Sequence, residues 1–87
     1  MYLGKVVGTV VSTSKNDNLI GMKFLLIEQL DEKMNRVGNV EIAVDSVGAG
    51  TGETVIVCKG SSARIVFEGN PPVDTVIVGI VDTVEVD

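Results

Sequence analysis

The sequence predicts an all-β fold: a small five-stranded β-barrel of the OB-like type with a short helical turn. Two observations carry this prediction. Five valine-rich stretches recur along the 87 residues, and no stretch shows a sustained helical period. Seventeen residues are valines, and β-branched side chains favour strands. A chain of this length forms one domain, so residues 1–87 are expected to fold as a single barrel.

The first two strands lie in the N-terminal part of the chain. We expect the first over residues 2–12, YLGKVVGTVVS, and the second over residues 22–30, MKFLLIEQL. The polar segment TSKNDN at 13–18 is expected to be a loop between them. A charged turn follows at 31–39, because its Asn and Gly residues favour turns.

The third and fourth strands flank a glycine-rich stretch. The third is expected over residues 40–47, VEIAVDSV, and the fourth over residues 54–59, TVIVCK. The stretch between them, GAGTGE at 48–53, contains three glycines and therefore predicts a turn rather than a continuous strand.

The last third of the chain alternates between turns and strands. A single helical turn is expected at Ser61–Arg64, after which the apolar residues IVF at 65–67 briefly resume a strand. The segment EGNPPVD at 68–74 is a loop by its glycine and paired prolines. The final strand, VIVGIVDTVEV, is expected over residues 76–86.

Several strands are apolar at both odd and even positions, as in FLLI at 24–27 and VIVGIV at 76–81. One set of side chains can fill a barrel, and the other then needs a cover. Hydrophobic residues make up 45% of the chain, which is a large share for so small a core. Exposed apolar strand edges invite uncontrolled pairing. We therefore expect the barrel exterior to be partly buried between copies of the chain.

Composition argues against several classes of function. The net charge is −5, the seven Lys and Arg residues are scattered, and only three residues are aromatic, which disfavours nucleic-acid binding. The chain has no histidine, the commonest general base and zinc ligand. No metal-ligand spacing is present, so neither a metal nor a cofactor is expected. The single cysteine, Cys58, excludes an intrachain disulfide and fits a reducing cytosol. We expect neither a signal peptide nor a membrane span.

The glycine-rich stretch at 48–53 is the first candidate site. Its G-x-G-x-G spacing differs from the dinucleotide fingerprint, G-x-G-x-x-G before a helix, and it lacks the Gly-Lys-Ser/Thr of a P-loop. Two interpretations stay open: the glycines provide a turn with positive φ, or small residues permit the close approach of a neighbouring subunit. The residues expected at an assembly interface here are Gly48, Ala49, Gly50, Gly52 and Glu53.

The stretch GSSAR at 60–64 is the second candidate site. A nucleophilic serine needs a base within reach, and Lys59 is the only candidate nearby. The simpler interpretation is that Ser61 or Ser62 caps the helical turn and that Arg64 pairs with a carboxylate. All three residues are expected to belong to the assembly motif.

Two aspartates, Asp45 and Asp82, lie in the apolar segments AVDSV and GIVDTV. Buried carboxylates can be catalytic or metal-bound, but they can equally accept hydrogen bonds at strand ends. We expect Asp45 and Asp82 to be buried acidic partners. Together with Glu53 they are the candidates for pairing with Arg64, within one subunit or across an interface.

Five stretches of the sequence, in order, resemble the EutN/CcmL family of pentameric vertex proteins from bacterial microcompartment shells. The most recognisable is IAVDSVGAGTGE at 42–53. The others are GKVVGTVVSTSK at 4–15, GMKFLLIEQLD at 21–31, GSSAR at 60–64, and PVD with VGIVDTV between 72 and 84. The resemblance covers nearly the whole chain.

The resemblance implies an OB-like barrel that assembles as a cyclic homopentamer. Such pentamers close the vertices of a polyhedral shell that is built mainly from hexameric shell proteins. It further implies a non-enzymatic protein without cofactors, located in the cytoplasm within the microcompartment shell and binding neither nucleic acid nor membrane. The GAGxGE and GSSAR forms lean toward a catabolic metabolosome rather than a carboxysome.

Two other functions compete with this one. A soluble oligomeric OB-like module that binds a small ligand or nucleic acid would need a basic or aromatic groove, and the sequence offers neither. An enzyme that uses the carboxylates of Asp45 and Asp82 ranks third, because no residue pattern supports it.

Overall fold

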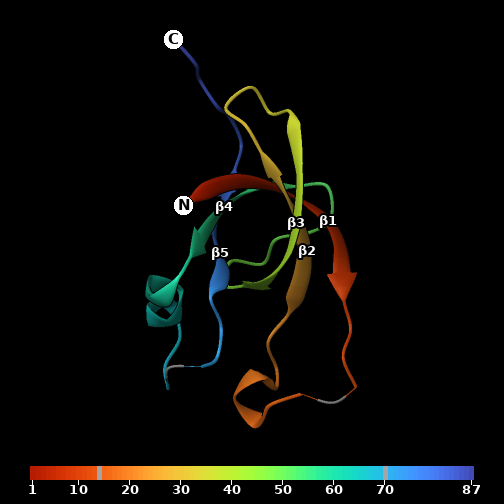
Figure 1. Cartoon of the computed structure of the whole chain (residues 1–87), viewed down its shortest axis with the longest axis vertical. Helices are drawn as coiled ribbons and strands as arrows, with labels where there is room; N and C mark the ends of the chain where they lie inside the picture. Colours follow the sequence, from red (N-terminus) through yellow and green to blue (C-terminus); the bar gives the residue numbers. More distant parts are fainter. Residues whose placement is uncertain (14, 70) are drawn as a thin grey trace.

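The computed structural model describes residues 1–13, 15–69 and 71–87 and confirms the predicted five-stranded barrel (Figure 1). The strands are β1 (Tyr2–Val10), β2 (Phe24–Leu30), β3 (Arg36–Asp45), β4 (Thr54–Lys59) and β5 (Thr75–Val81). Two 3-10 helices accompany them, η1 (Asp17–Leu19) and η2 (Ser61–Val66). Helix is therefore a minor component, as the sequence predicts.

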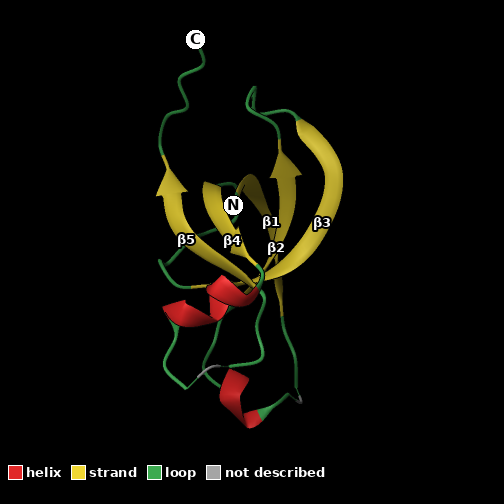
Figure 2. Ribbon diagram, turned by 60° about the vertical axis from the view of Figure 1, so that its left-hand side comes forward, coloured by secondary structure: helices red, strands yellow, loops and turns green. Residues whose placement is uncertain are grey.

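The sheet closes on itself in the order β1-β2-β3-β5-β4. Neighbouring strands are antiparallel except β3 and β5, which run parallel where Val44 lies opposite Val76 and Asp45 opposite Ile77. Figure 2 shows both helices at one end of the barrel and the β2–β3 turn and C-terminus at the other. None of the helices in the described part of the chain has the length and apolar character needed to cross a membrane.

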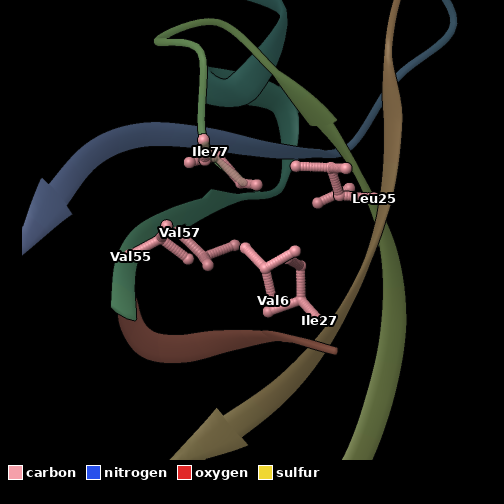
Figure 3. Packing of buried hydrophobic residues seen from close by; sticks show 8 residues of the cluster. Val6, Leu25, Ile27, Val55, Val57 and Ile77 are labelled. Carbon is pink, nitrogen blue, oxygen red and sulfur yellow. The ribbon is translucent and has the colours of Figure 1, made fainter. Parts of the chain in front are cut away.

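The barrel interior is filled by aliphatic side chains from all five strands, which meet at its centre (Figure 3). Ile27 on β2 and Val57 on β4 are fully buried, and Val6 on β1 is almost fully buried. Each buried side chain of this size contributes about 1.5–3 kcal/mol relative to an exposed one. The remaining members of this cluster are Leu25, Ala43, Ala49, Val55 and Ile77.

A second apolar cluster lies outside the barrel and is covered by the subunit's own helices and loops. Its buried members are Val44, Ala63, Val73 and Val76. Partly buried residues from both helical regions and three strands pack against them: Leu19, Met22, Phe24, Cys58, Phe67 and Val78. The apolar strand side chains that do not fill the barrel therefore lie in two kinds of place. Part is covered within the subunit, and part stays exposed, including Val40 and Ile42 on β3 and Ile56 and Ile80 on β4 and β5.

The third strand begins four residues earlier than expected, at Arg36 rather than at residue 40. Its added residues pair with β2, where Arg36 lies opposite Leu30. The turn is consequently shorter and is closed by Asp31, whose Oδ1 accepts hydrogen bonds from Lys33 N at 2.8 Å and Asn35 N at 2.9 Å. Asn35 stays in the turn, whereas cross-strand pairing outweighed the local turn preference of Gly38.

Two further expectations on secondary structure are corrected. The apolar run at 65–67 does not resume a strand, because Ile65 and Val66 end η2 and are exposed. The last strand ends at Val81, and residues 82–87 form no regular element. The loop expected at 13–18 overlaps with η1, which runs from Asp17 to Leu19. Ser14 in that loop and Asn70 in the loop at 68–74 lie outside the described residues.

Candidate functional site

The glycine-rich loop joins β3 to β4 and is held by the carboxylate of Asp45. Asp45 Oδ1 accepts a hydrogen bond from Val47 N at 3.1 Å, and its Oδ2 accepts one from Ala49 N at 2.9 Å. Lys23 Nζ donates to Ala49 O at 2.7 Å, and Ala49 itself is fully buried in the barrel core. Asp45, at the end of β3, therefore acts as a local acceptor that shapes the loop.

The second half of the loop is fastened to itself and to β1. Glu53 Oε1 accepts a hydrogen bond from Gly50 N at 2.7 Å, and Glu53 N donates to Gly50 O at 3.1 Å. Gly52 N donates to Val6 O at 2.8 Å, while Val6 N donates to Glu53 O at 3.0 Å. The amides of residues 47, 49, 50 and 52 are thus already bonded within the subunit. A phosphate cradle needs free amides, so this geometry does not suit one.

The glycines of the loop have different roles. Gly48 has φ of 82° and Gly52 has φ of 91°, in the left-handed region that favours glycine, and a Cβ on either would meet no atom within 4 Å. The turn interpretation therefore explains these two. Gly50 is not in that region, and a Cβ there would lie 3.5 Å from Glu53 Oε1, which is ordinary contact. Only a neighbouring subunit could require glycine at Gly50, and that contact stays a prediction.

This difference predicts that two alanine substitutions affect different properties, the stability of the subunit and the association of subunits. We expect Gly48→Ala to lower the free energy of unfolding by about 1–2 kcal/mol, because a Cβ disfavours the left-handed conformation by that amount. Gly50→Ala should leave the free energy of unfolding of a single subunit almost unchanged and act instead on the association of subunits. Denaturant unfolding and size-exclusion chromatography of both variants measure the two effects. Equal unfolding curves for the two variants would contradict the assignment of roles.

The GSSAR stretch forms the start of η2, but its serines do not cap the helix. Gly60, with φ of 88°, occupies the N-cap, and no side chain caps the first turn. The expected capping by Ser61 or Ser62 is therefore wrong. Ser61 is exposed, and Ser62 Oγ lies 3.6 Å from Cys58 Sγ. Lys59, the candidate base for a serine nucleophile, is instead bonded to Glu41 Oε2.

Arg64 is exposed on the single subunit and bonds to backbone. Its Nε donates to Val73 O at 3.3 Å, which ties η2 to the segment before β5. Asp45 and Glu53 are engaged with the glycine loop, and Asp82 is exposed rather than buried. Asp45 is only half-buried. The expected pairing of Arg64 with one of these carboxylates does not occur within the described part of one subunit, and pairing across an interface stays a prediction.

A polar trio that sequence reasoning missed connects three strands. The hydroxyl of Tyr2 on β1 donates to Glu41 Oε1 at 3.2 Å, and Lys59 Nζ at the end of β4 lies 2.5 Å from Glu41 Oε2. These residues are 39 and 18 positions apart in sequence, so no local pattern indicates the contact. Burial, the charge of Glu41 and the hydrogen bond to Glu41 together raise the pKa of Tyr2 to about 12. A phenol that is harder to ionise suits a structural role.

The raised pKa of Tyr2 predicts a stability change at alkaline pH. Because the folded pKa of about 12 lies above the ordinary value of 10.0, folding favours the neutral phenol. Its contribution is fully present below pH 10 and is lost as the pH rises toward 12. Tyr2 is the only tyrosine, and the chain has no tryptophan, so ultraviolet absorbance follows its ionisation alone. We expect Glu41→Gln to lower the midpoint of this titration, and an unchanged midpoint would contradict the coupling.

The described residues contain no cluster of three or more potential metal ligands. A pocket of about 140 Å³ lies between η1, β3 and the segment before β5. Binding sites for small molecules are usually about 300–1,000 Å³, so this pocket is small for a ligand site. Six of its eight lining residues are apolar: Leu19, Phe24, Ile42, Val44, Pro72 and Val73, with Asp74 and Thr75 completing the lining.

Comparison with known proteins identifies the family. The family described as "Ethanolamine utilisation protein EutN/carboxysome" matches residues 1–82. The chain belongs to the EutN/CcmL family. The resemblance seen in the sequence is therefore confirmed over almost its whole length.

Individual members of the EutN/CcmL family are similar to the chain from end to end. The bacterial microcompartment shell vertex protein GrpN of Rhodospirillum rubrum is 56% identical over 86 residues, which are 98% of this chain and 97% of GrpN. The carboxysome shell vertex protein CcmL of Synechocystis is 52% identical over 87 residues, 99% of this chain and 87% of that protein. The solved structure of GrpN, a pentameric microcompartment shell protein, superposes with a TM-score of 0.94 and covers 100% of both chains at 55% identity.

Proposed function

We propose that this protein is a non-catalytic structural component of a bacterial microcompartment shell, and that five copies form a ring that caps a shell vertex. The likeness to GrpN carries the proposal, because a TM-score of 0.94 over both complete chains leaves no room for a different subunit shape. The hydrogen-bonded glycine loop agrees with a structural role.

The mechanism is geometric. A flat sheet of hexagonal tiles has no curvature, and a five-fold unit at a vertex provides it. A cyclic ring uses a heterologous interface, in which two different surfaces of each subunit meet. The barrel exterior offers apolar surface for this purpose, since Val40, Ile42, Ile56 and Ile80 are between 36% and 55% exposed on a single subunit.

The finer assignment is a catabolic metabolosome rather than a carboxysome, with hexameric shell proteins as partners and a cytoplasmic location. The support for this lean comes from the sequence, in the full GAGTGE and GSSAR forms of the motifs at 48–53 and 60–64.

Native mass spectrometry tests the proposed assembly. We expect a homopentamer of about 46 kDa, five times the 9.2 kDa chain, as the dominant species at micromolar concentration. The apolar exterior gives the physical reason, because association removes it from water. A stable monomer or dimer as the dominant species would overturn the proposal.

A further inference from the structure

The N-terminal part of β3 is a strand edge that has a partner on only one side. β2 pairs with β3 from Arg36 to Val44, whereas β5 pairs with it only at Val44 and Asp45. Val37, Val40 and Ile42 along this edge are 46%, 50% and 55% exposed. A long edge with apolar side chains is a template for pairing with another chain, so something is expected to cover it.

The segment at 82–87, DTVEVD, is an extended stretch that leaves the barrel after β5. Figure 1 shows it beyond the sheet at the same end of the subunit as the β2–β3 turn, and Figure 2 shows it on the side of the barrel away from β3. Val84 and Val86 alternate with polar residues, the pattern of a half-buried strand. Yet the segment forms no regular element in the described subunit. Its sequence is typical of a strand, but it has no pairing partner in its own barrel.

The segment and the β3 edge carry exposed side chains of opposite charge. The segment carries three exposed carboxylates, at Asp82, Glu85 and Asp87. The β2–β3 turn and the start of β3 carry two exposed cations, Lys33 and Arg36. Arg36 also faces Glu28 at 3.4 Å but keeps 58% of its side chain exposed.

Two acids belong to the same turn. Asp31 accepts the hydrogen bonds that close the turn, and Glu32 is the exposed acid beside the two cations. The two acids balance the two cations, so the turn has no net positive charge, and only single ion pairs with Lys33 or Arg36 are available to the segment.

We propose that residues 82–87 of one subunit add as a strand to the free edge of β3 in the next subunit. The inference rests on the proposed ring, which gives every edge a neighbour and needs two different surfaces on each subunit. The C-terminal segment and the start of β3 lie at the same end of the subunit's long axis (Figure 2). If the ring axis is parallel to that long axis, the segment of one subunit is level with the β3 edge of the next. Backbone hydrogen bonds then give affinity and the alternating valines give register.

Disulfide trapping between subunits tests this contact. In a Cys58→Ser background, Val40→Cys is combined with Val84→Cys and, to allow for register, separately with Val86→Cys. After oxidation we expect at least one pair to give a ladder of covalent oligomers up to five chains, which a reductant collapses to the monomer. The matched control combines Ile20→Cys with Val84→Cys. Ile20 is also exposed, but it lies beside η1 at the opposite end of the barrel, so only monomer is expected.

A second variant avoids dependence on cysteine geometry. Val84→Ser with Val86→Ser removes apolar contacts without a charge change, and we expect it to weaken association about tenfold or more, which corresponds to about 1.4 kcal/mol. Thr83→Ala, on the opposite face of the segment and likewise without a charge change, serves as its control and should have the smaller effect. Native mass spectrometry at several concentrations gives the comparison.

The outcomes separate the two proposals. A pentamer that yields no ladder, or only cross-links within one chain, and that tolerates both serine substitutions would overturn the strand addition and leave the ring intact. A natural sequence that stays monomeric would overturn the ring itself.

Discussion

Gly4→Ala is expected to lower the free energy of unfolding by an amount near the upper end of about 1–3 kcal/mol, the usual range for overpacking a core. Gly4 is buried on β1, and a Cβ there would lie closer than 3.0 Å to Cγ2 of Ile27 and 3.3 Å from Cγ2 of Val57. Ile27 is β-branched and fully buried, so its Cγ2 has little freedom to move. Denaturant unfolding at a fixed protein concentration measures the loss.

Gly8 on the same strand provides the matched control. A Cβ on Gly8 would lie 3.8 Å from Leu26 Cβ, which is ordinary contact, and Gly8 does not have positive φ. Gly8→Ala should therefore be neutral or stabilise by about 0.4–1 kcal/mol through the unfolded chain. If the two variants unfold alike, the tight packing between β1 and β2 at Gly4 does not limit stability.

The sequence predicted β4 at its observed bounds, because glycines end the apolar run on both sides at Gly52 and Gly60. It failed where distant pairing decides the outcome. β3 extends to Arg36 because β2 provides a pairing partner there, and the final strand stops at Val81 because it lies opposite Thr54, the first residue of β4. Local composition carries no information on where a partner strand ends.

The prediction of a strand at 65–67 was wrong for a related reason. Its apolar residues predict a strand by composition, yet the continuing helix leaves Ile65 83% exposed. A three-residue run is too short for periodicity to distinguish a strand from a helix. The chain around it decided the conformation, since Gly60 starts η2 and Ala63 anchors it in the outer cluster.

For the candidate site, the spacing of the glycines argued against a phosphate loop, and the bonded amides of the loop agree with that prediction. Spacing did not separate the glycines that need positive φ from Gly50, because that distinction depends on backbone angles. The contacts among Tyr2, Glu41 and Lys59 could not be predicted from the sequence for another reason, because these residues meet only when the barrel closes. The prediction of a pentamer came from the family resemblance, because the contacts within a single subunit do not reveal how subunits assemble.

Asp45→Ala is expected to lower the free energy of unfolding by about 2–3 kcal/mol. The carboxylate accepts hydrogen bonds from Val47 N at 3.1 Å and Ala49 N at 2.9 Å, and bonds to a charged group contribute about 1.5–3 kcal/mol. The Ala49 amide is the important one, because Ala49 is fully buried and its N–H has no other partner of this kind in the described geometry. Loosening Ala49 also frees the loop that carries Gly50, so association of subunits should weaken as well.

Asp82→Ala is the matched control, since both aspartates follow an apolar strand but Asp82 is exposed on the subunit. We expect it to change the free energy of unfolding by less than about 0.5 kcal/mol, the usual range for surface positions. Asp45→Asn keeps one acceptor oxygen and should fall between the two, because it can serve only one of the two amides as an acceptor. Thermal and denaturant unfolding of the three variants rank them. If Asp45→Ala were as mild as Asp82→Ala, the glycine loop would owe its shape to Gly48 and Gly52 alone rather than to the carboxylate beneath it.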